Sequence, residues 1–357
     1  MRIPLTELEK DMIIDEDVFT NQGNMLVGRG FSVSNPVILT NLLKKHGIPS
    51  VKVLVQSADI KEDEPEEPKV QLEKEIVSFK EEFKETVSEI QQEIKNIQEG
   101  PADKEVFDRI LETGLDRQKN SRINIFQLLQ KMKDNDDETF SHCYSVSLSA
   151  YAIGKWLELD EDRLKQLTLS AILADIGKVS IDQKILSKKL PLDEKEMQEI
   201  KKHVHYSAEL TSSYDLGNEL KAGVMFHHER TDGSGYPHGL TDEQIPLFAR
   251  IIAIADVYIA LTSNRSYRKK NTPLEAVRIM QNEYMKKLDI KILTEFFNRI
   301  TQSYIGNPVT LNDGRSAEIV FISRNNLSRP VIKVDDTDGM IDLGLMENSH
   351  IDITEFV

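Results

Sequence analysis

Through the middle of the chain, apolar residues recur three and four positions apart, the spacing that places them on one face of a helix. The pattern is clearest at 123–132, 146–157, 164–176 and 248–261, and strand-like alternation is almost absent there. The sequence therefore predicts a mainly α protein, with an all-helical bundle over residues 101–308.

The first 56 residues have a different pattern and predict a small α+β domain. Segments 12–19 and 25–33 have the composition of strands and flank a turn-forming cluster. A short helix should follow and end at Gly47, before an alternating strand at 50–55.

Residues 309–357 lose the helical pattern again and predict a short β-rich extension. An Asp-Gly pair at 313–314 is typical of a hairpin turn. Strands are expected at 317–322, 331–334 and 351–356.

Two segments join the N-terminal domain to the bundle. The acidic, proline-bearing run at 57–70 has little to bury and predicts a linker. Residues 71–100 carry one apolar stripe at spacings of three and four, which predicts a long amphipathic helix. The stripe consists of Leu72, Ile76, Phe79, Phe83, Val87, Ile90, Ile94 and Ile97. It either packs on its own bundle or pairs with a second chain, so a homodimer through residues 72–97 is one of two expectations.

Composition narrows the classes of partner and compartment. The formal net charge of −15 argues against a general nucleic-acid or acidic-membrane binder, because phosphate contacts need clustered Lys and Arg. There is no apolar run of about eighteen residues, and the N-terminus lacks the apolar centre of a signal peptide. The single cysteine, Cys143, fits a reducing cytosol. We therefore expect a cytoplasmic protein that binds neither DNA nor RNA nor a membrane.

The strongest chemical signal is the run from His227 to Pro237. It reads His-His-Glu-Arg-Thr-Asp-Gly-Ser-Gly-Tyr-Pro and combines two adjacent imidazoles, two carboxylates and a glycine-rich turn. Imidazoles followed by a tight turn indicate a metal site beside a substrate cleft.

A second contribution to this site is expected from Asp175, which interrupts an apolar helix. A buried carboxylate is costly unless it is paired or bound to a cation. Each feature alone has an ordinary alternative, since Asp175 could form a local ion pair and the histidines could lie on the surface. Six of the eight histidines fall between positions 142 and 238, however, which favours one shared site.

Taken in order, these pieces resemble the HD-GYP phosphodiesterases, a bacterial family that hydrolyses cyclic di-GMP. The resemblance covers roughly residues 105–308. The matching pieces are Ser141-His142, Asp175-Ile176-Gly177-Lys178, Ile200 to His203, the run from His227 to Pro237, Arg250 to Tyr258, and Arg265 to Arg268. One departure matters: Ala174 stands where the family has the histidine of its His-Asp pair.

The resemblance implies an HD-type bundle that binds one or two divalent transition-metal ions. The first ion would be held by His203, His227 and His228, with Asp175 bridging to the second. The second would be held by His142, Asp175 and Asp256. It would lack a fourth ligand, because Ala174 replaces the family's histidine. Mixed imidazole and carboxylate ligands suit Fe or Mn, which we favour, and also Zn or Ni.

The resemblance also implies residues that act on the substrate. Asp175 and Lys178 are expected to be catalytic. Substrate contacts are expected from Lys178, Arg250, Arg265, Arg268 and Tyr236. Guanidinium groups can bind phosphate through two hydrogen bonds. On sequence alone Lys178 is also compatible with an ordinary cation at a helix C-terminus.

Two functions follow from this ligand set. One is a metal-dependent hydrolase that opens cyclic di-GMP to the linear dinucleotide or to GMP, with a rate reduced by the missing ligand. The other is a catalytically inactive module that senses cyclic di-GMP. A scaffold without a ligand is disfavoured, because it would have no use for so many buried polar groups.

Overall fold

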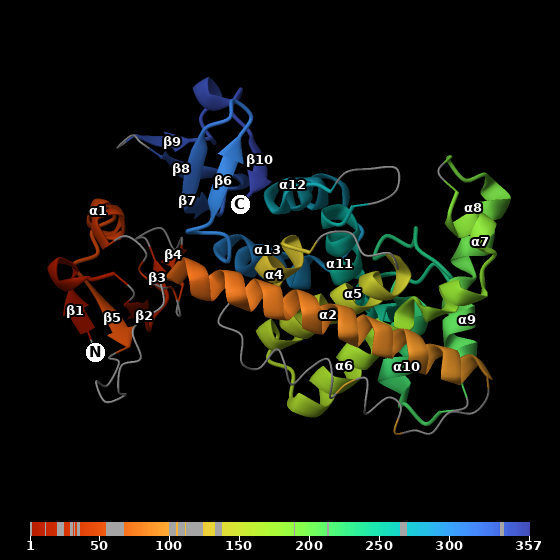
Figure 1. Cartoon of the computed structure of the whole chain (residues 1–357). Helices are drawn as coiled ribbons and strands as arrows, with labels where there is room; N and C mark the ends of the chain where they lie inside the picture. Colours follow the sequence, from red (N-terminus) through yellow and green to blue (C-terminus); the bar gives the residue numbers. More distant parts are fainter. Residues whose placement is uncertain are drawn as a thin grey trace. The chain divides into compact units, whose positions relative to one another are not determined.

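The structure is a computed structural model of the chain, and it contains two compact units (Figure 1). One comprises Met1–Glu67 together with Tyr304–Val357, and the other comprises Pro68–Ser303. The residues described are 2–10, 12–19, 25–28, 31, 33, 36–54, 68–99, 105, 111, 124–132, 138–188, 190–212, 214–264, 270–335 and 339–357.

The unit over Pro68–Ser303 is helical, as predicted. Its helices are α2 (Pro68–Glu99), α4 (Ile125–Gln130), α5 (Glu138–Trp156), α6 (Glu161–Ala174), α7 (Gln183–Leu186), α8 (Glu194–Lys201), α9 (His203–Leu210), α10 (Asn218–Phe226), α11 (Leu247–Thr262), α12 (Pro273–Glu283) and α13 (Ile290–Gln302). All four segments with the clearest helical spacing lie in or overlap these helices. The mainly α fold class is therefore confirmed.

Side-chain caps define where several of these helices begin. Asp160 accepts a hydrogen bond from the amide of Arg163 at the start of α6, and Thr272 accepts one from Glu275 at the start of α12. Asp289 caps α13 by accepting from two backbone amides. Such caps satisfy amides that have no partner within the helix.

Helices α5, α6 and α11 pack against one another in the helical unit. α11 is apolar on nearly all sides, and most of its residues are buried. A helix with this composition is stable only inside a core. Its two charged residues, Arg250 and Asp256, are therefore held at defined positions in an otherwise apolar segment.

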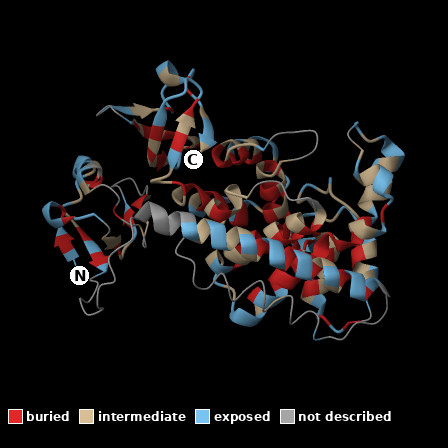
Figure 2. Cartoon of the chain, in the orientation of Figure 1, coloured by how far each residue is buried: buried red, intermediate tan, exposed pale blue. Residues whose placement is uncertain are grey.

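The long helix α2 lies along the bundle of its own chain. Figure 2 shows exposed residues on its outer side and buried ones facing the bundle. Phe83, Val87, Ile90, Ile94 and Ile97 are buried in one core with residues of α5, α6 and α10. The sequence left two possible partners for this apolar stripe, the chain's own bundle and a second chain. In the structure the stripe packs on the chain's own bundle. A homodimer through the same helix stays a prediction.

The other unit contains the β-strands. Its N-terminal part consists of β1 (Arg2–Pro4), β2 (Ile13–Ile14), β3 (Val18–Phe19), β4 (Met25–Val27), α1 (Pro36–Lys45) and β5 (Ser50–Leu54). The strand order β1-β5-β2 makes a small antiparallel sheet, and β3 pairs with β4. Segment 12–19, expected as one strand, is two, because β2 pairs with β5 whereas β3 pairs with β4. Segment 25–33 is a strand only as far as Val27.

The C-terminal part of this unit is one antiparallel sheet of order β10-β6-β7-β8-β9. Its strands are β6 (Pro308–Leu311), β7 (Ser316–Ser323), β8 (Asn326–Val334), β9 (Met340–Asp342) and β10 (Ile353–Phe356). The predicted hairpin turn joins β6 to β7, and Gly314 adopts a φ of 85° there. Phe321 of β7 packs against the core of the N-terminal part, so the two ends of the chain share one unit.

Within the described residues, no helix combines the length and the apolar character that a membrane crossing requires.

Candidate metal centre

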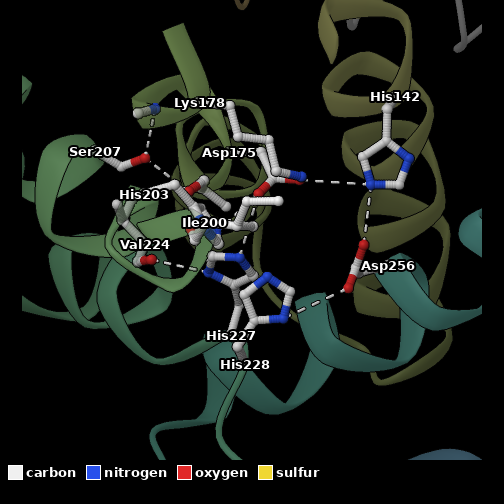
Figure 3. Close-up of polar contacts among 12 residues, drawn as sticks. His142, Asp175, Lys178, Ile200, His203, Ser207, Val224, His227, His228 and Asp256 are labelled. Atoms are coloured by element: carbon white, nitrogen blue, oxygen red, sulfur yellow. Dashed lines mark hydrogen bonds and ion pairs between the residues drawn. The ribbon is translucent and has the colours of Figure 1, made fainter. Parts of the chain in front are cut away.

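The six predicted metal ligands converge in the helical unit (Figure 3). They come from five places in the chain: α5, the end of α6, the start of α9, the residues directly after α10, and α11. These residues are His142, Asp175, His203, His227, His228 and Asp256. Their ligand atoms form two groups that share Asp175.

The first group contains Asp175, His203, His227 and His228, and one ligand atom from each lies within 4.8 Å of the others. Oδ1 of Asp175 is 3.0 Å from Nε2 of His203 and 3.7 Å from Nε2 of His227. Asp175, His203 and His227 are buried, and His228 is partly buried. Four ligands of this kind form a complete set for a transition-metal ion.

Backbone contacts define the tautomers of two of these histidines. Nδ1 of His203 lies 2.7 Å from the carbonyl oxygen of Ile200, and Nδ1 of His227 lies 2.9 Å from that of Val224. In the neutral ring the proton is therefore on Nδ1, and Nε2 presents a lone pair.

Oδ1 of Asp175 and the Nε2 atoms of His203 and His227 are buried without a hydrogen-bond partner. Although Nε2 of His203 is 3.0 Å from the carboxylate, two lone pairs face each other there. Two ligand atoms about 2.1 Å from one ion, at right angles, lie about 3 Å apart. The residues present therefore fit a bound cation.

The second group contains His142, Asp175 and Asp256. Nε2 of His142 is 2.9 Å from Oδ1 of Asp256 and 3.5 Å from Oδ2 of Asp175. Ala174 is buried beside them and offers only a methyl group. This group has three side-chain ligands where the family pattern has four.

Burial and charge set the protonation of the centre. Burial alone would raise the pKa of Asp175, but the Lys178 ammonium holds that pKa well below its usual range. Burial opposes ionisation of Asp256 too, yet the hydrogen bond from His142 keeps its pKa low. Burial and His227 lower the pKa of His228. Ionised carboxylates and neutral imidazoles are the forms that bind metal ions.

A close approach of two backbones brings Asp175 to His203. Residues Ile176–Ser180 form a 3-10 turn after α6, and the amide of Gly177 donates to Oγ of Ser207 on α9 over 2.8 Å. The Ser207 hydroxyl donates in turn to the carbonyl oxygen of Ala174. A Cβ atom on Gly177 would lie 2.1 Å from the carbonyl oxygen of His203, so only glycine fits there. The predictions missed Ser207, because one buried serine carries no signal in a sequence.

Lys178 lies next to the centre, as predicted. Its Nζ is 2.7 Å from Oδ2 of Asp175. Burial would lower the pKa of Lys178, but the charge of Asp175 raises it, so the ammonium form is retained. This contact joins residues three positions apart, and the catalytic role of Lys178 stays a prediction.

The glycine-rich run places Tyr236 against the first ligand group. The ring of Tyr236 stacks on that of His228, with centroids 4.7 Å apart and planes inclined by 26°. Burial raises the pKa of the Tyr236 hydroxyl, so the phenol stays neutral.

Glu229 fixes the loop that carries Tyr236, and the predictions did not name it. Its buried carboxylate accepts hydrogen bonds from the amides of His238 and Leu240, at 2.7 and 2.9 Å. Gly235 lies so close that a Cβ atom there would be 2.4 Å from Cα of Glu229. The signal available in the sequence was a carboxylate directly after the paired histidines.

The three predicted substrate-binding arginines have different outcomes. Nε of Arg250 donates to the carbonyl oxygen of Ile245, Nη2 donates to that of Asp242, and Nη1 pairs with Asp289 at 2.6 Å. Through these contacts Arg250 joins the loop before α11 to the start of α13, and its substrate contact stays a prediction. The positions of Arg265 and Arg268 lie outside the described residues.

Comparisons with known proteins agree with this fold and centre. Residues 127–292, within the helical unit, match the family described as HD domain. A cyclic di-GMP phosphodiesterase of Pseudomonas aeruginosa is 32% identical over 212 residues, which cover 59% of this chain and 51% of that protein. A 3'3'-cGAMP-specific phosphodiesterase of Vibrio cholerae is 35% identical over 156 residues, covering 43% of this chain and 30% of that relative.

A solved structure supports the same fold. An HDG"Y"P protein from Bdellovibrio bacteriovorus covers 84% of this chain and 99% of its own, with a TM-score of 0.52. At 16% identity this likeness concerns the fold alone. Residues 127–292 of the helical unit are thus similar to HD domains, and the curated relatives that resemble this part of the chain are named cyclic-dinucleotide phosphodiesterases. The chain spans about half the length of the first two curated relatives it matches, 51% and 50%.

Proposed function

We propose that this protein is a metal-dependent phosphodiesterase that hydrolyses cyclic di-GMP. The observation that carries the proposal is the group of Asp175, His203, His227 and His228, in which the buried ligand atoms of the first three have no hydrogen-bond partner. The names of the relatives supply the substrate class, cyclic dinucleotides.

A divalent transition-metal ion fits this donor set, with Fe or Mn favoured and Zn or Ni also compatible. When bound, it supplies Lewis-acid charge to a phosphodiester and activates water for attack. His203 and His227 would hold it through Nε2, because their Nδ1 atoms lie at hydrogen-bonding distance from backbone carbonyls.

The chain's own charged residues would orient and neutralise the substrate phosphate. Asp175 stays ionised and lies in both ligand groups, so it is the residue that would couple them. Lys178 keeps its ammonium 2.7 Å from Asp175, where it adds positive charge beside a phosphate oxygen. Tyr236, neutral and stacked on His228, lies directly beside the first ligand group.

The second ligand group sets the expected rate. His142, Asp175 and Asp256 keep three side-chain ligands, and Ala174 removes the fourth. Loss of an outer-shell partner typically lowers metal affinity or activity by about 10–100-fold, and loss of a direct ligand should cost at least as much. We therefore propose a slow hydrolase with one firmly held ion and a weak second site.

Ala174 also favours a second candidate, an inactive sensor of cyclic di-GMP. Such a module would keep the first ion and the phosphate contacts, and would lack the second ion that assists hydrolysis.

The test uses purified protein reconstituted with Fe(II) or Mn(II) under exclusion of oxygen. The hydrolase should convert cyclic di-GMP to a linear product, followed by chromatography, with 3'3'-cGAMP as a parallel substrate. A matched protein with His203→Asn should lose metal and turnover together. Binding without turnover over long incubation with several metals would favour the sensor, and absence of both would refute the proposal.

A further inference from the structure

Lys201 lies at the edge of the metal centre, although the ligand set does not include it. It is the last residue of α8, two positions before the ligand His203. Its Nζ is 5.2 Å from the centroid of the Tyr236 ring. Since Tyr236 stacks on His228, Lys201 lies over an aromatic group that itself contacts the first ligand group.

We infer that Lys201 contacts a phosphate of the bound cyclic dinucleotide and positions it, together with the hydroxyl of Tyr236. This inference rests on the proposed function. The chemistry it requires is a phosphodiester anion at the pocket edge, recognised by an ammonium and a neutral phenol.

The first support is that Lys201 has no carboxylate partner among the described residues. Its neighbours differ: Nζ of Lys202 is 2.6 Å from Oε2 of Glu199, and Lys188 pairs with Glu196 on the same helix. Lys178 is neutralised by Asp175. Lys201 is therefore a cation near the centre whose charge is not used by a protein carboxylate.

The second support is the state of Tyr236. Its ring stacks on that of His228, and its hydroxyl has no hydrogen-bond partner among the described residues. A neutral hydroxyl can donate to a phosphate oxygen. A cation over the ring is also attracted by its π face, which holds Lys201 near the pocket before a ligand arrives.

The third support is charge balance. The centre contains the carboxylates of Asp175 and Asp256 against the ammonium of Lys178. One divalent ion leaves a net charge of about +1, whereas a cyclic dinucleotide carries about two negative charges on its phosphates. The ammonium of Lys201, at the edge of the centre, would offset the remaining negative charge of the ligand.

Another cation near Tyr236, Arg230, is engaged elsewhere. Its Nη1 donates to the carbonyl oxygens of His227 and Glu229, at 3.2 and 2.8 Å. These bonds tie Arg230 to the backbone of the ligand segment, so Lys201 is the better candidate for the substrate.

The experiment compares Lys201→Met with Lys202→Met in the full chain loaded with Mn(II). Methionine keeps much of the side-chain length and removes the charge, and Lys202 is the adjacent, exposed lysine paired with Glu199. Equilibrium binding of cyclic di-GMP is measured at two salt concentrations, with metal content determined for each protein.

Lys201→Met should weaken binding about tenfold or more, because a charge-assisted hydrogen bond is lost. Its affinity should also depend less on salt than that of the wild type. Lys201→Arg should restore most of the binding, whereas Lys202→Met should bind like the wild type. Metal content should be unchanged in all of them.

Unchanged affinity in Lys201→Met, at equal metal content, overturns the inference and leaves the proposed function intact. Loss of metal in Lys201→Met also overturns it, because Lys201 would then act on the ligands. If the wild type itself binds no cyclic dinucleotide, the proposed function fails, and the inference with it.

Discussion

Gly177 and Ser207 are joined by a hydrogen bond of 2.8 Å from the glycine amide to the serine hydroxyl oxygen. This bond ties the turn after Asp175 to the helix that begins at His203. The metal centre therefore depends on a backbone contact that contains no ligand atom.

Replacing Gly177 by alanine should break this contact. The added Cβ would lie 2.1 Å from the carbonyl oxygen of His203, so the turn and α9 must separate. We expect a loss of about 1–3 kcal/mol in the free energy of unfolding, together with reduced metal binding. Urea unfolding and elemental analysis measure the two effects.

Gly154→Ala is the matched control for this substitution. The nearest atoms to its Cβ would be the side-chain ends of Leu167, Leu164 and Leu159, at 2.8, 2.9 and 3.4 Å. Metal content should stay at the wild-type level. Equal metal loss in both variants would contradict the role assigned to Gly177.

Glu229→Gln should loosen the loop that holds Tyr236 without removing a ligand. The amide group of glutamine would replace one of the two acceptor oxygens that bind the amides of His238 and Leu240. A buried amide left unpaired costs about 1–3 kcal/mol. Thermal unfolding should show this loss, with metal content unchanged.

The exposed Glu243 provides a control, since Glu243→Gln should leave the unfolding temperature unchanged. The assignment is wrong if the two substitutions have the same effect.

Ala174→His should restore the second ligand group. His142, Asp175 and Asp256 are already assembled there, so an added imidazole completes the set. We expect bound metal to rise from about one ion per chain toward two, with a rate gain of about tenfold or more. Elemental analysis and turnover of cyclic di-GMP measure the two changes.

The double variant Ala174→His with Asp256→Asn tests whether the gain depends on a complete second ligand group. It adds one ligand to that group and removes another. It should bind no more metal than the wild type. If Ala174→His alone raises neither metal content nor rate, position 174 does not face the second site.

The metal-free protein should lose stability as the pH falls. Burial and His227 lower the pKa of folded His228 from its ordinary value of 6.5, so the unfolded chain binds more protons. The stabilisation is complete above the unfolded pKa and is lost as the pH falls toward the folded one. Urea unfolding with a chelator should therefore show a free energy that decreases below about pH 6.5.

Two variants identify the group responsible. His228→Gln should flatten this slope above about pH 5, where carboxylates remain ionised. His205→Gln should preserve it, because His205 is exposed. An identical slope in all three proteins would assign the effect elsewhere.

Phe83→Ala tests the role of α2 in the bundle. Phe83 is buried, and its ring lies 4.9 Å from that of Tyr144 on α5. Truncating a buried phenylalanine costs about 3–5 kcal/mol. The unfolding midpoint should therefore fall. The size of this fall should be the same at every protein concentration, because the contact lies within one chain.

Val77→Asp is the companion variant, since Val77 is 55% exposed on the same helix. It should leave stability unchanged. A midpoint that rises with protein concentration, or that falls in Val77→Asp, would indicate pairing of α2 with a second chain.

The amino-acid pattern was enough to predict the mainly α bundle, the long amphipathic helix and the candidate metal ligands. Helical spacing records which face is buried, and α2 ends at Glu99, close to the expected end of the helix at residue 100. His142, His203 and Asp256 could be named because each lies in a stretch of sequence that resembles a motif of the HD-GYP phosphodiesterases.

Only the tertiary structure decided what these residues touch. It showed that α2 packs on its own chain, that Arg250 binds carbonyls and Asp289, and that Glu229 and Ser207 hold the centre together. Periodicity describes one segment at a time, whereas these contacts join residues that are far apart along the chain. Their partners are set by how the helices pack, which no local pattern encodes.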